Sequence, residues 1–370
     1  MICFSLLNGL AERGHQIYAY ANTAPIQAHS PNLYVKTGQH KVPANSLAPW
    51  EQAWRAEKWM KELERSTKFD LVWRMHPYGG GCPTVPKTGG LPLVVGPLFT
   101  EWPADFSQPQ NTGLPRFGVS LQKIVTPSAE RGWQQTLERA SLLVCATDAR
   151  AKSLQEEYPS ARAVVTPVII ESPFGEDHIV RSAPNVSRPL KLLIAAHFVP
   201  NKNLDIFCRT VKMLCDSGIR VKATILGDGP GRVEIAALLA DNDLTDTVCL
   251  KGKLPHAQVW EHLRDADLLL SCSGYEAYGR TIVEAMSVGT PAVCYYGSRG
   301  PAEIVTDEIN GLLVSALTAE AYANRIAALL ARPGAWEALS ANALRAAEQW
   351  RSAAVLDILE DRLVRLAAGK

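Results

Sequence analysis

From residue 190 onward, short apolar runs alternate with amphipathic stretches, and this alternation predicts strands and helices in turn. The predicted strands are 191–196, 220–226, 247–250, 267–270, 291–294 and 312–314. The helices predicted between them are 203–216, 231–241, 256–264 and a short one near 301–306, with further helices to the end of the chain. Strands that alternate with helices form a parallel sheet that is covered on both faces. We therefore expect a doubly wound α/β domain at 190–350.

The first half of the chain shows the same alternation less regularly. Strands are predicted at 15–20, 70–75, 91–95, 142–145 and 163–165, and helices at 3–13, 48–66, 148–158 and within 117–139. Residues 171–189 are polar and contain three prolines, which is typical of a linker between domains. The sequence thus predicts two α/β domains, 1–170 and 190–350. A strand normally opens such a domain, whereas this chain begins with a predicted helix, so we expect the first strand to be missing.

The composition limits the classes of function. Hydrophobic residues make up 47% of the chain and charged residues 20%, as in ordinary soluble proteins. A net charge of +1 gives no support to nucleic-acid binding. No apolar run is long enough to span a membrane, and the N-terminus lacks the pattern of a signal peptide. The eight cysteines lack Cys-x-x-Cys spacing, and we interpret them as buried thiols of a reducing, cytoplasmic compartment.

Four loops of the second domain follow predicted strands, and doubly wound sheets bind their ligands at the carboxyl ends of the strands. The first of these loops carries His197 and Lys202. Lys202 lies just ahead of a helix and is suited to neutralise a diphosphate, although a solvated surface lysine fits the same spacing equally well. His197 is placed to donate to a phosphate, although a histidine at a strand end is more often structural.

The second and third loops offer weaker signals. Residues 226–231 contain three glycines between a strand and a helix, but Arg232 breaks the GxGxxG fingerprint. Gly227 therefore marks either a tight turn or a nucleotide contact. In the third loop, the backbone of Lys253 and Leu254 is placed to pair with the edge of a base. A plain connector is an equally good interpretation of that loop.

The fourth loop and the helix after it, residues 271–286, carry the strongest signal. Glu276 lies in the turn, and Glu284 lies within a helix that is predicted to open near 278–280. Free amides at a helix start bind anions, and a carboxylate accepts hydrogen bonds from hydroxyls. Glutamates near a helix start are usually only surface residues that suit the helix dipole. The convergence of four loops instead favours a site for a phosphorylated sugar.

Several other chemistries are absent or weak in the sequence. Asp-x-Asp occurs at 241–243 and 265–267, but the first lies at a helix end and the second leads into a strand, so neither is expected to hold a metal. The P-loop, HExxH and Cys/His metal patterns do not occur. In the first domain, His76 ends a predicted strand ahead of three glycines, which suggests either close approach of a ligand or a flexible turn.

With these residues in place, the second domain resembles the retaining glycosyltransferases of family 4, which have the GT-B fold. Glu276 and Glu284 fit the E-x7-E signature of that family, and the match continues through residue 291. Residues 226–230 fit the family's glycine turn, and residues 301–314 fit the segments that follow. The similarity is close over 190–315 and holds only in outline over 1–170.

The resemblance implies two doubly wound, Rossmann-like domains that face each other across a cleft, with residues 351–370 packing back on the first domain. It implies a nucleotide-sugar donor of UDP or GDP type in the second domain. Glu276 would contact the sugar, Glu284 the ribose and Lys202 the diphosphate. Glu276, Lys202 and His76 would be the catalytic residues. The remaining donor contacts would come from His197, Gly227, Lys253, Leu254, Ala277, Tyr278 and Gly279.

The reaction implied is transfer of a hexose with retention of the anomeric configuration, without a metal and without a bound cofactor. The first domain would bind a carbohydrate, lipid-linked or small-molecule acceptor beside His76. A lipid-linked acceptor would bring the protein to the inner face of the membrane by peripheral contact.

The sequence departs from the family at three places. His197 stands where the family usually has arginine, and residues 168–170 replace the usual Asn-Gly. The first strand and its glycine-rich loop are expected to be missing, through a truncated start or a compensating partner. His197 and the missing first strand favour one alternative to the transferase, a weak or inactive relative that binds nucleotide sugars. An epimerase of GT-B fold is a further alternative.

Overall fold

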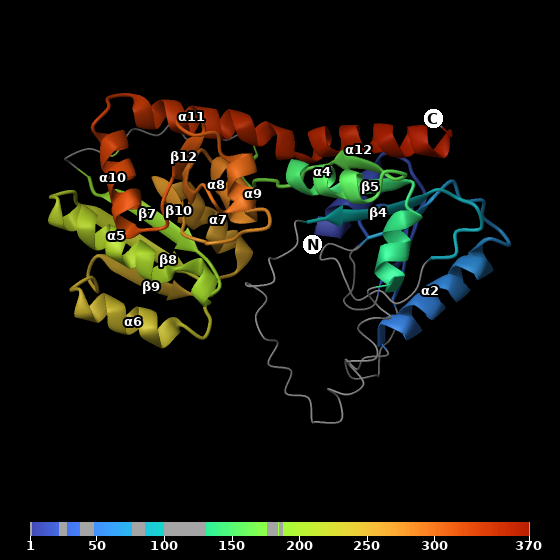
Figure 1. Ribbon diagram of the computed structural model, residues 1–370, viewed down its shortest axis with the longest axis horizontal. Helices are drawn as coiled ribbons and strands as arrows, with labels where there is room; N and C mark the ends of the chain where they lie inside the picture. Colours follow the sequence, from blue (N-terminus) through green and yellow to red (C-terminus); the bar gives the residue numbers. More distant parts are fainter. Residues whose placement is uncertain are drawn as a thin grey trace, which may run out of the picture. The chain divides into compact units, whose positions relative to one another are not determined.

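The computed structural model describes residues 2–21, 28–37, 48–75, 86–99, 131–175, 184 and 188–369. The described chain divides into two compact units (Figure 1). The first unit comprises Met1–Ile169 together with Ser352–Lys370, and the second comprises Ile170–Arg351. Each unit has a parallel sheet at its centre, as the alternation of strands and helices predicts.

The second unit is built on a parallel sheet whose strand order among the described residues is β12-β11-β10-β7-β8-β9. The strands are β7 (Leu190–Ala195), β8 (Val221–Leu226), β9 (Val248–Gly252), β10 (Leu268–Ser271), β11 (Ala292–Tyr295) and β12 (Gly311–Val314). The chain extends the sheet from β7 through β9 and then returns to the other side of β7 with β10. The order therefore reverses between β7 and β10, and sheets of this kind bind their ligands at the carboxyl ends of the strands beside such a reversal.

Helices connect these strands and cover both faces of the sheet (Figure 1). Their bounds are α5 (Leu204–Asp216), α6 (Arg232–Asp241), α7 (His256–Asp265), α8 (Arg280–Met286), α9 (Arg299–Ile304), α10 (Ala319–Leu330) and α11 (Ala335–Ala347), with the 3-10 turns η2 (Pro200–Lys202) and η3 (Glu348–Trp350). One face packs on α5, α6 and α10 in a single apolar cluster. Helices α7 and α8 contact β7, β10 and β11. Because both faces are buried, the strands are almost continuously apolar.

The first unit has two hydrogen-bonded sheets among its described residues, β1-β2 and β3-β4-β5-β6, and both are parallel. The strands are β1 (Ile17–Ala21), β2 (Leu33–Thr37), β3 (Val72–Arg74), β4 (Leu93–Leu98), β5 (Leu142–Cys145) and β6 (Arg162–Val165). The helices are α1 (Ile2–Glu12), α2 (Ala48–Leu63), α4 (Asp148–Glu157), the C-terminal α12 (Ser352–Ala367) and one within 131–138.

The larger sheet of the first unit is covered on both faces. On one face, α4 and the helix at 131–138 pack against Leu93, Val95 and Leu143. On the other face, α1 and α12 pack against Val94 and Val144. Alternate residues of β4 therefore point into different apolar clusters, as the pleat of a strand requires.

The sequence did not predict β2, which pairs in parallel with β1 over five residues. Its composition, Leu-Tyr-Val-Lys-Thr, buries only the leucine, so its apolar run is too weak to stand out. The interpretation of the cysteines as buried thiols holds for Cys145 and Cys294 but is wrong for Cys249, which is exposed on the edge strand β9.

Among the described helices, none has the length and apolar character needed to cross a bilayer.

Candidate functional site: the strand-end loops of the second unit

The loops after β7 and β10 meet at the point where the strand order reverses. Asn201 joins them, because its side chain donates to the Tyr275 carbonyl at 2.8 Å and accepts from the Tyr275 amide at 3.0 Å. The amide of Gly274 donates to the Asn201 carbonyl at 3.0 Å. These bonds hold the segment that leads to Glu276 against the segment that leads to Lys202, so the predicted convergence of the first and fourth loops is present.

Lys202 and Glu276 form an ion pair between these two loops. Their side chains are 19% and 23% exposed, so both are partly shielded from water while still reachable by a ligand. Lys202 ends η2, and Asn203 after it adopts a left-handed conformation that starts α5. An ammonium group on a short turn beside a carboxylate offers donors to a phosphate and an acceptor to a hydroxyl.

The loop after β8 lies against the loop after β7. The Gly227 backbone has φ of +121°, and a Cβ there would lie 1.8 Å from the Ala196 carbonyl oxygen. The His197 ring bonds through Nδ1 to the carbonyl oxygen of Asp228 at 2.6 Å. A carbonyl can only accept, so Nδ1 carries a hydrogen, and Nε2 donates to a phosphate only when the ring is doubly protonated.

The loop after β9 joins the same group, because the Gly227 amide donates to the Gly252 carbonyl at 2.9 Å. Lys253 in this loop is exposed, and Leu254 is half-buried. All four loops singled out from the sequence are therefore linked by hydrogen bonds or ion pairs at one end of the sheet.

Glu284 is the most buried charged residue of the group, with 4% of its surface exposed. Its Oε1 accepts from Arg280 Nε at 2.8 Å and from His256 Nε2 at 3.1 Å. Within the described structure, no hydrogen bond falls on Oε2. The carboxylate is thus held through one oxygen, and the other keeps its capacity to accept from a ligand.

The segment between Glu276 and α8 is fixed by its backbone. The Gly300 amide, in the short helix α9, donates to the Glu276 carbonyl at 2.9 Å. Gly279 has φ of +99° and ends the loop just before α8. Tyr278 is buried and Ala277 half-buried, so their side chains belong to the packing of the loop. His76, the predicted site residue of the first unit, lies outside the described residues.

The second Asp-x-Asp match has a structural role. Asp267 is 3% exposed, and its two oxygens accept from the guanidinium of Arg188 at 2.7 and 2.9 Å. The amide of Lys191 adds a third bond at 2.8 Å. The bond to Asp267 raises the pKa of Arg188. This carboxylate therefore ties the start of β7 to the start of β10, at the end of the sheet opposite the four loops.

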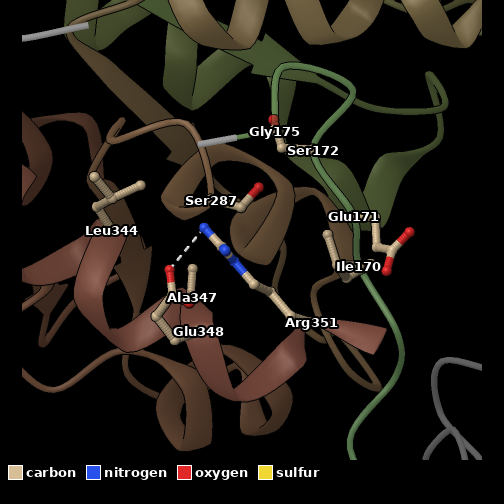
Figure 2. A pocket seen from close by; sticks show the side chains of 9 residues that line it. All are labelled: Ile170, Glu171, Ser172, Gly175, Ser287, Leu344, Ala347, Glu348 and Arg351. Atoms are coloured by element: carbon tan, nitrogen blue, oxygen red, sulfur yellow. Dashed lines mark ion pairs between the residues drawn. The ribbon is translucent and has the colours of Figure 1, made fainter. Parts of the chain in front are cut away.

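A pocket of about 230 Å³ lies at the carboxyl end of α8 (Figure 2). Its lining includes Ser287, whose hydroxyl donates to the Glu284 carbonyl at 2.8 Å, and Arg351, which pairs with Glu348 at 2.8 Å. Ile170 and Arg351, the first and last residues of the second unit, both line it. None of the predicted donor residues does, so the pocket is separate from the four loops.

The sequence did not single out three residues that organise these loops, namely Asn201, His256 and Arg280. Arg280 precedes Glu284 by four residues on the same helix, a spacing that commonly pairs such side chains. His256 is two residues beyond Leu254 and opens α7. Nothing in the sequence pattern links it to Glu284, because that contact depends on how two helices pack.

Comparison with known proteins places these four loops within a domain of a known family. The family model of the glycosyl transferases group 1 matches residues 175–346. Residues 175–346 are thus a glycosyl transferases group 1 domain. This domain contains all four loops and both glutamates, together with Lys202 and His256.

The chain is similar to several proteins that are named as glycosyltransferases. A poly(ribitol-phosphate) alpha-N-acetylglucosaminyltransferase of Staphylococcus aureus (strain COL) is 31% identical over 119 residues, covering 32% of this chain and 24% of that protein. The putative colanic acid biosynthesis glycosyltransferase WcaL of Escherichia coli (strain K12) is 30% identical over 203 residues, covering 53% of this chain and 49% of that protein. The chain thus spans no more than about half the length of these relatives.

Among solved structures, Anabaena Alr3699/HepE in complex with UDP has a TM-score of 0.67 and 17% identity, with 98% of this chain and 95% of that chain covered. This similarity extends over both units, so the chain has the GT-B fold, with two Rossmann-like α/β domains.

Proposed function

We propose that this protein is a glycosyltransferase that moves a sugar from a nucleotide sugar of UDP or GDP type to an acceptor. The observation that carries the proposal is the Lys202–Glu276 ion pair at the point where the strand order of the group 1 domain reverses. The curated relatives are named as glycosyltransferases, and the Anabaena protein was crystallised with UDP. The Lys202 ammonium group can donate hydrogen bonds to the phosphates of such a donor, and the Glu276 carboxylate can accept them from its sugar hydroxyls.

In this proposal, Lys202 binds the diphosphate, Glu276 accepts from sugar hydroxyls and Glu284 holds the ribose through Oε2. Negative charge develops on the diphosphate as the glycosidic bond breaks. A fixed ammonium group lowers the energy of that transition state, because it is already oriented before the reaction begins. The backbone of 277–279 lies beside the sugar and phosphate, and the backbone of Lys253 and Leu254 meets the base.

The transfer proceeds with retention of configuration, and the transferred group is a hexose. It requires neither a metal nor a bound cofactor. Asp267 supports the metal-independent reaction, since its carboxylate is committed to Arg188 and the Lys191 amide. The first unit binds a carbohydrate, lipid-linked or small-molecule acceptor, with His76 among the catalytic residues. The protein works in the cytoplasm, with peripheral membrane contact where the acceptor is a lipid.

A second candidate is a protein that binds nucleotide sugars without transferring them. His197 favours it, because one ring nitrogen is used by the Asp228 carbonyl and a neutral ring has no further hydrogen for the diphosphate. An epimerase of GT-B fold is the third candidate, and it would release an isomeric sugar without needing an acceptor.

Thermal-shift measurements with UDP-, GDP- and ADP-sugars test donor binding by the complete chain. Donor hydrolysis and transfer, measured for the wild-type protein and for Glu276→Ala, then separate a transferase from a binding protein. We expect one nucleotide sugar to raise the melting temperature and Glu276→Ala to abolish turnover. The proposal is wrong if no nucleotide sugar shifts melting. Binding without turnover supports the second candidate, and an isomeric free sugar supports the epimerase.

A further inference from the structure

His256 connects two parts of the donor site that come from different helices. It opens α7 directly after the loop of Lys253 and Leu254, and its Nε2 lies 3.1 Å from Glu284 Oε1 on α8. A carboxylate only accepts hydrogen bonds, so His256 Nε2 carries the hydrogen of this contact. The ring also meets Trp260 edge-on, with centroids 5.7 Å apart. Because Trp260 is 4% exposed, the imidazole has a rigid support on its own helix.

Arg280 and His256, which both donate to Glu284, restrain its carboxylate relative to different parts of the domain. Arg280 lies one turn earlier on the same helix, so its bond to Glu284 is a contact within α8. His256 restrains it relative to α7 and to the loop after β9. Both bonds fall on Oε1, so together they set the direction in which Oε2 points.

We propose that His256 is a positioning residue of the donor site, which holds Glu284 Oε2 toward the ribose hydroxyls and fixes the loop of Lys253 and Leu254 at the matching distance for the base. The inference rests on the proposed function, since it requires a nucleotide in these loops. It adds a residue that touches neither the sugar nor the phosphates. Its effect is confined to nucleoside recognition, and this distinguishes it from a residue that only stabilises the fold.

The test uses the complete chain and isothermal titration with UDP, GDP and ADP. The nucleotide that binds most tightly is then compared with its 2′-deoxy counterpart. The variants are His256→Ala, His256→Gln, which keeps a hydrogen-bond donor, and His262→Ala as a matched control on the same helix. Circular dichroism confirms that each variant is folded.

We expect His256→Ala to weaken binding of the ribonucleotide about tenfold, as loss of a hydrogen bond to a charged group does. The loss of affinity for the 2′-deoxy nucleotide should be clearly smaller, because this nucleotide lacks a hydroxyl that donates to Glu284. Removing His256 and removing that hydroxyl affect the same contact, so their effects are not additive. His256→Gln should recover most of the affinity, and His262→Ala should bind as the wild-type protein does.

Two results would overturn the inference in distinguishable ways. His256 has no positioning role if His256→Ala binds the nucleotide as tightly as the wild-type protein does. The same conclusion follows if the substitution lowers the affinity for the ribonucleotide and for its 2′-deoxy counterpart by the same factor. If none of the three nucleotides binds the wild-type protein, the proposed function itself is wrong, and the inference is lost with it.

Discussion

Lys202 donates to Glu276 from the neighbouring strand-end loop, so the cation and the carboxylate proposed for the donor site hold each other in place before a donor arrives. An ammonium group has three hydrogens, and one bond to Glu276 leaves two for phosphate oxygens. The ion pair therefore orients Lys202 and still leaves it hydrogen-bond donors for a ligand. Arginine in this position would present a planar fork with different geometry, so the two cations are not interchangeable here.

Replacing Lys202 by alanine should lower kcat/KM for the donor about 100-fold, the scale expected for loss of one fixed electrostatic contact to the transition state. Most of the loss should appear in kcat. The control is Lys212→Ala, because Lys212 pairs with Asp216 on the exposed side of α5. Steady-state kinetics of both variants test this prediction. An unchanged kcat in Lys202→Ala would show that Lys202 does not stabilise the transition state.

Gly227 should not tolerate a side chain. A Cβ there would lie 1.8 Å from the Ala196 carbonyl oxygen, so β7 and β8 would have to separate at their carboxyl ends. We expect Gly227→Ala to lower the free energy of unfolding by more than about 3 kcal/mol, in the range of severe packing conflicts. Gly218→Ala is the control, because Gly218 also has positive φ (+85°) but no atom within 4 Å of the added carbon. Its cost should be about 1–2 kcal/mol from backbone strain alone.

Urea denaturation followed by circular dichroism compares the two glycine variants directly. Equal losses of stability would show that backbone conformation, and not the contact with Ala196, explains the glycine at 227.

Asp267→Asn should destabilise the second unit by about 1.5–3 kcal/mol, because it removes the negative charge that accepts both hydrogen bonds from Arg188. Asp265→Asn provides the comparison, since Asp265 pairs with Lys191 but is 67% exposed. A surface pair of that kind contributes about 0–1 kcal/mol. Thermal unfolding with and without added Mn²⁺ distinguishes this structural role from metal binding. Stabilisation of the wild-type protein, but not of Asp267→Asn, by the metal would contradict the assignment.

The sequence predicts the strands and loops of the second unit well because its strands are buried on both faces and read as apolar runs between glycine turns. The position of Glu276 in a turn and of Glu284 within the helix follows from the same pattern. Partners across elements could not be predicted in this way. Asn201 bonds to Tyr275 and His256 to Glu284 only because sheet order and helix packing bring them together, and neither distance is encoded in local spacing.

In the first unit, sequence patterns are less informative for a physical reason. Strand β2 buries only one residue and was not predicted, whereas β3 (Val72–Arg74) lies within the predicted strand at 70–75 but is shorter than it. The partners of Arg13 and His15 on α12 lie more than 300 residues away in sequence, and the structure alone reveals them.

Glu360 of α12 offers a test of how the C-terminal helix is attached within the first unit. Its Oε2 accepts from Arg13 at 2.7 Å and its Oε1 from His15 at 2.7 Å. The hydrogen bond from Arg13, followed by that from His15, lowers the pKa of Glu360 below its ordinary value of 4.5. The same contact raises the pKa of Arg13. Beneath these charges, Leu356 and Leu359 of α12 pack on α1.

A carboxyl group whose pKa is lower in the folded protein than in the unfolded chain stabilises the fold at pH values above the unfolded pKa. That stabilisation is lost as the pH falls through the folded pKa. Glu360→Gln should therefore be less stable than the wild-type protein at pH 7, and the difference should shrink between about pH 5 and pH 3. Asp361→Asn is the matched control, because Asp361 pairs only one turn along α12 with the exposed Arg365. Urea denaturation at several pH values measures both differences. A Glu360→Gln difference that stays constant down to pH 3 would mean that the carboxylate charge does not fasten α12 to Arg13 and His15.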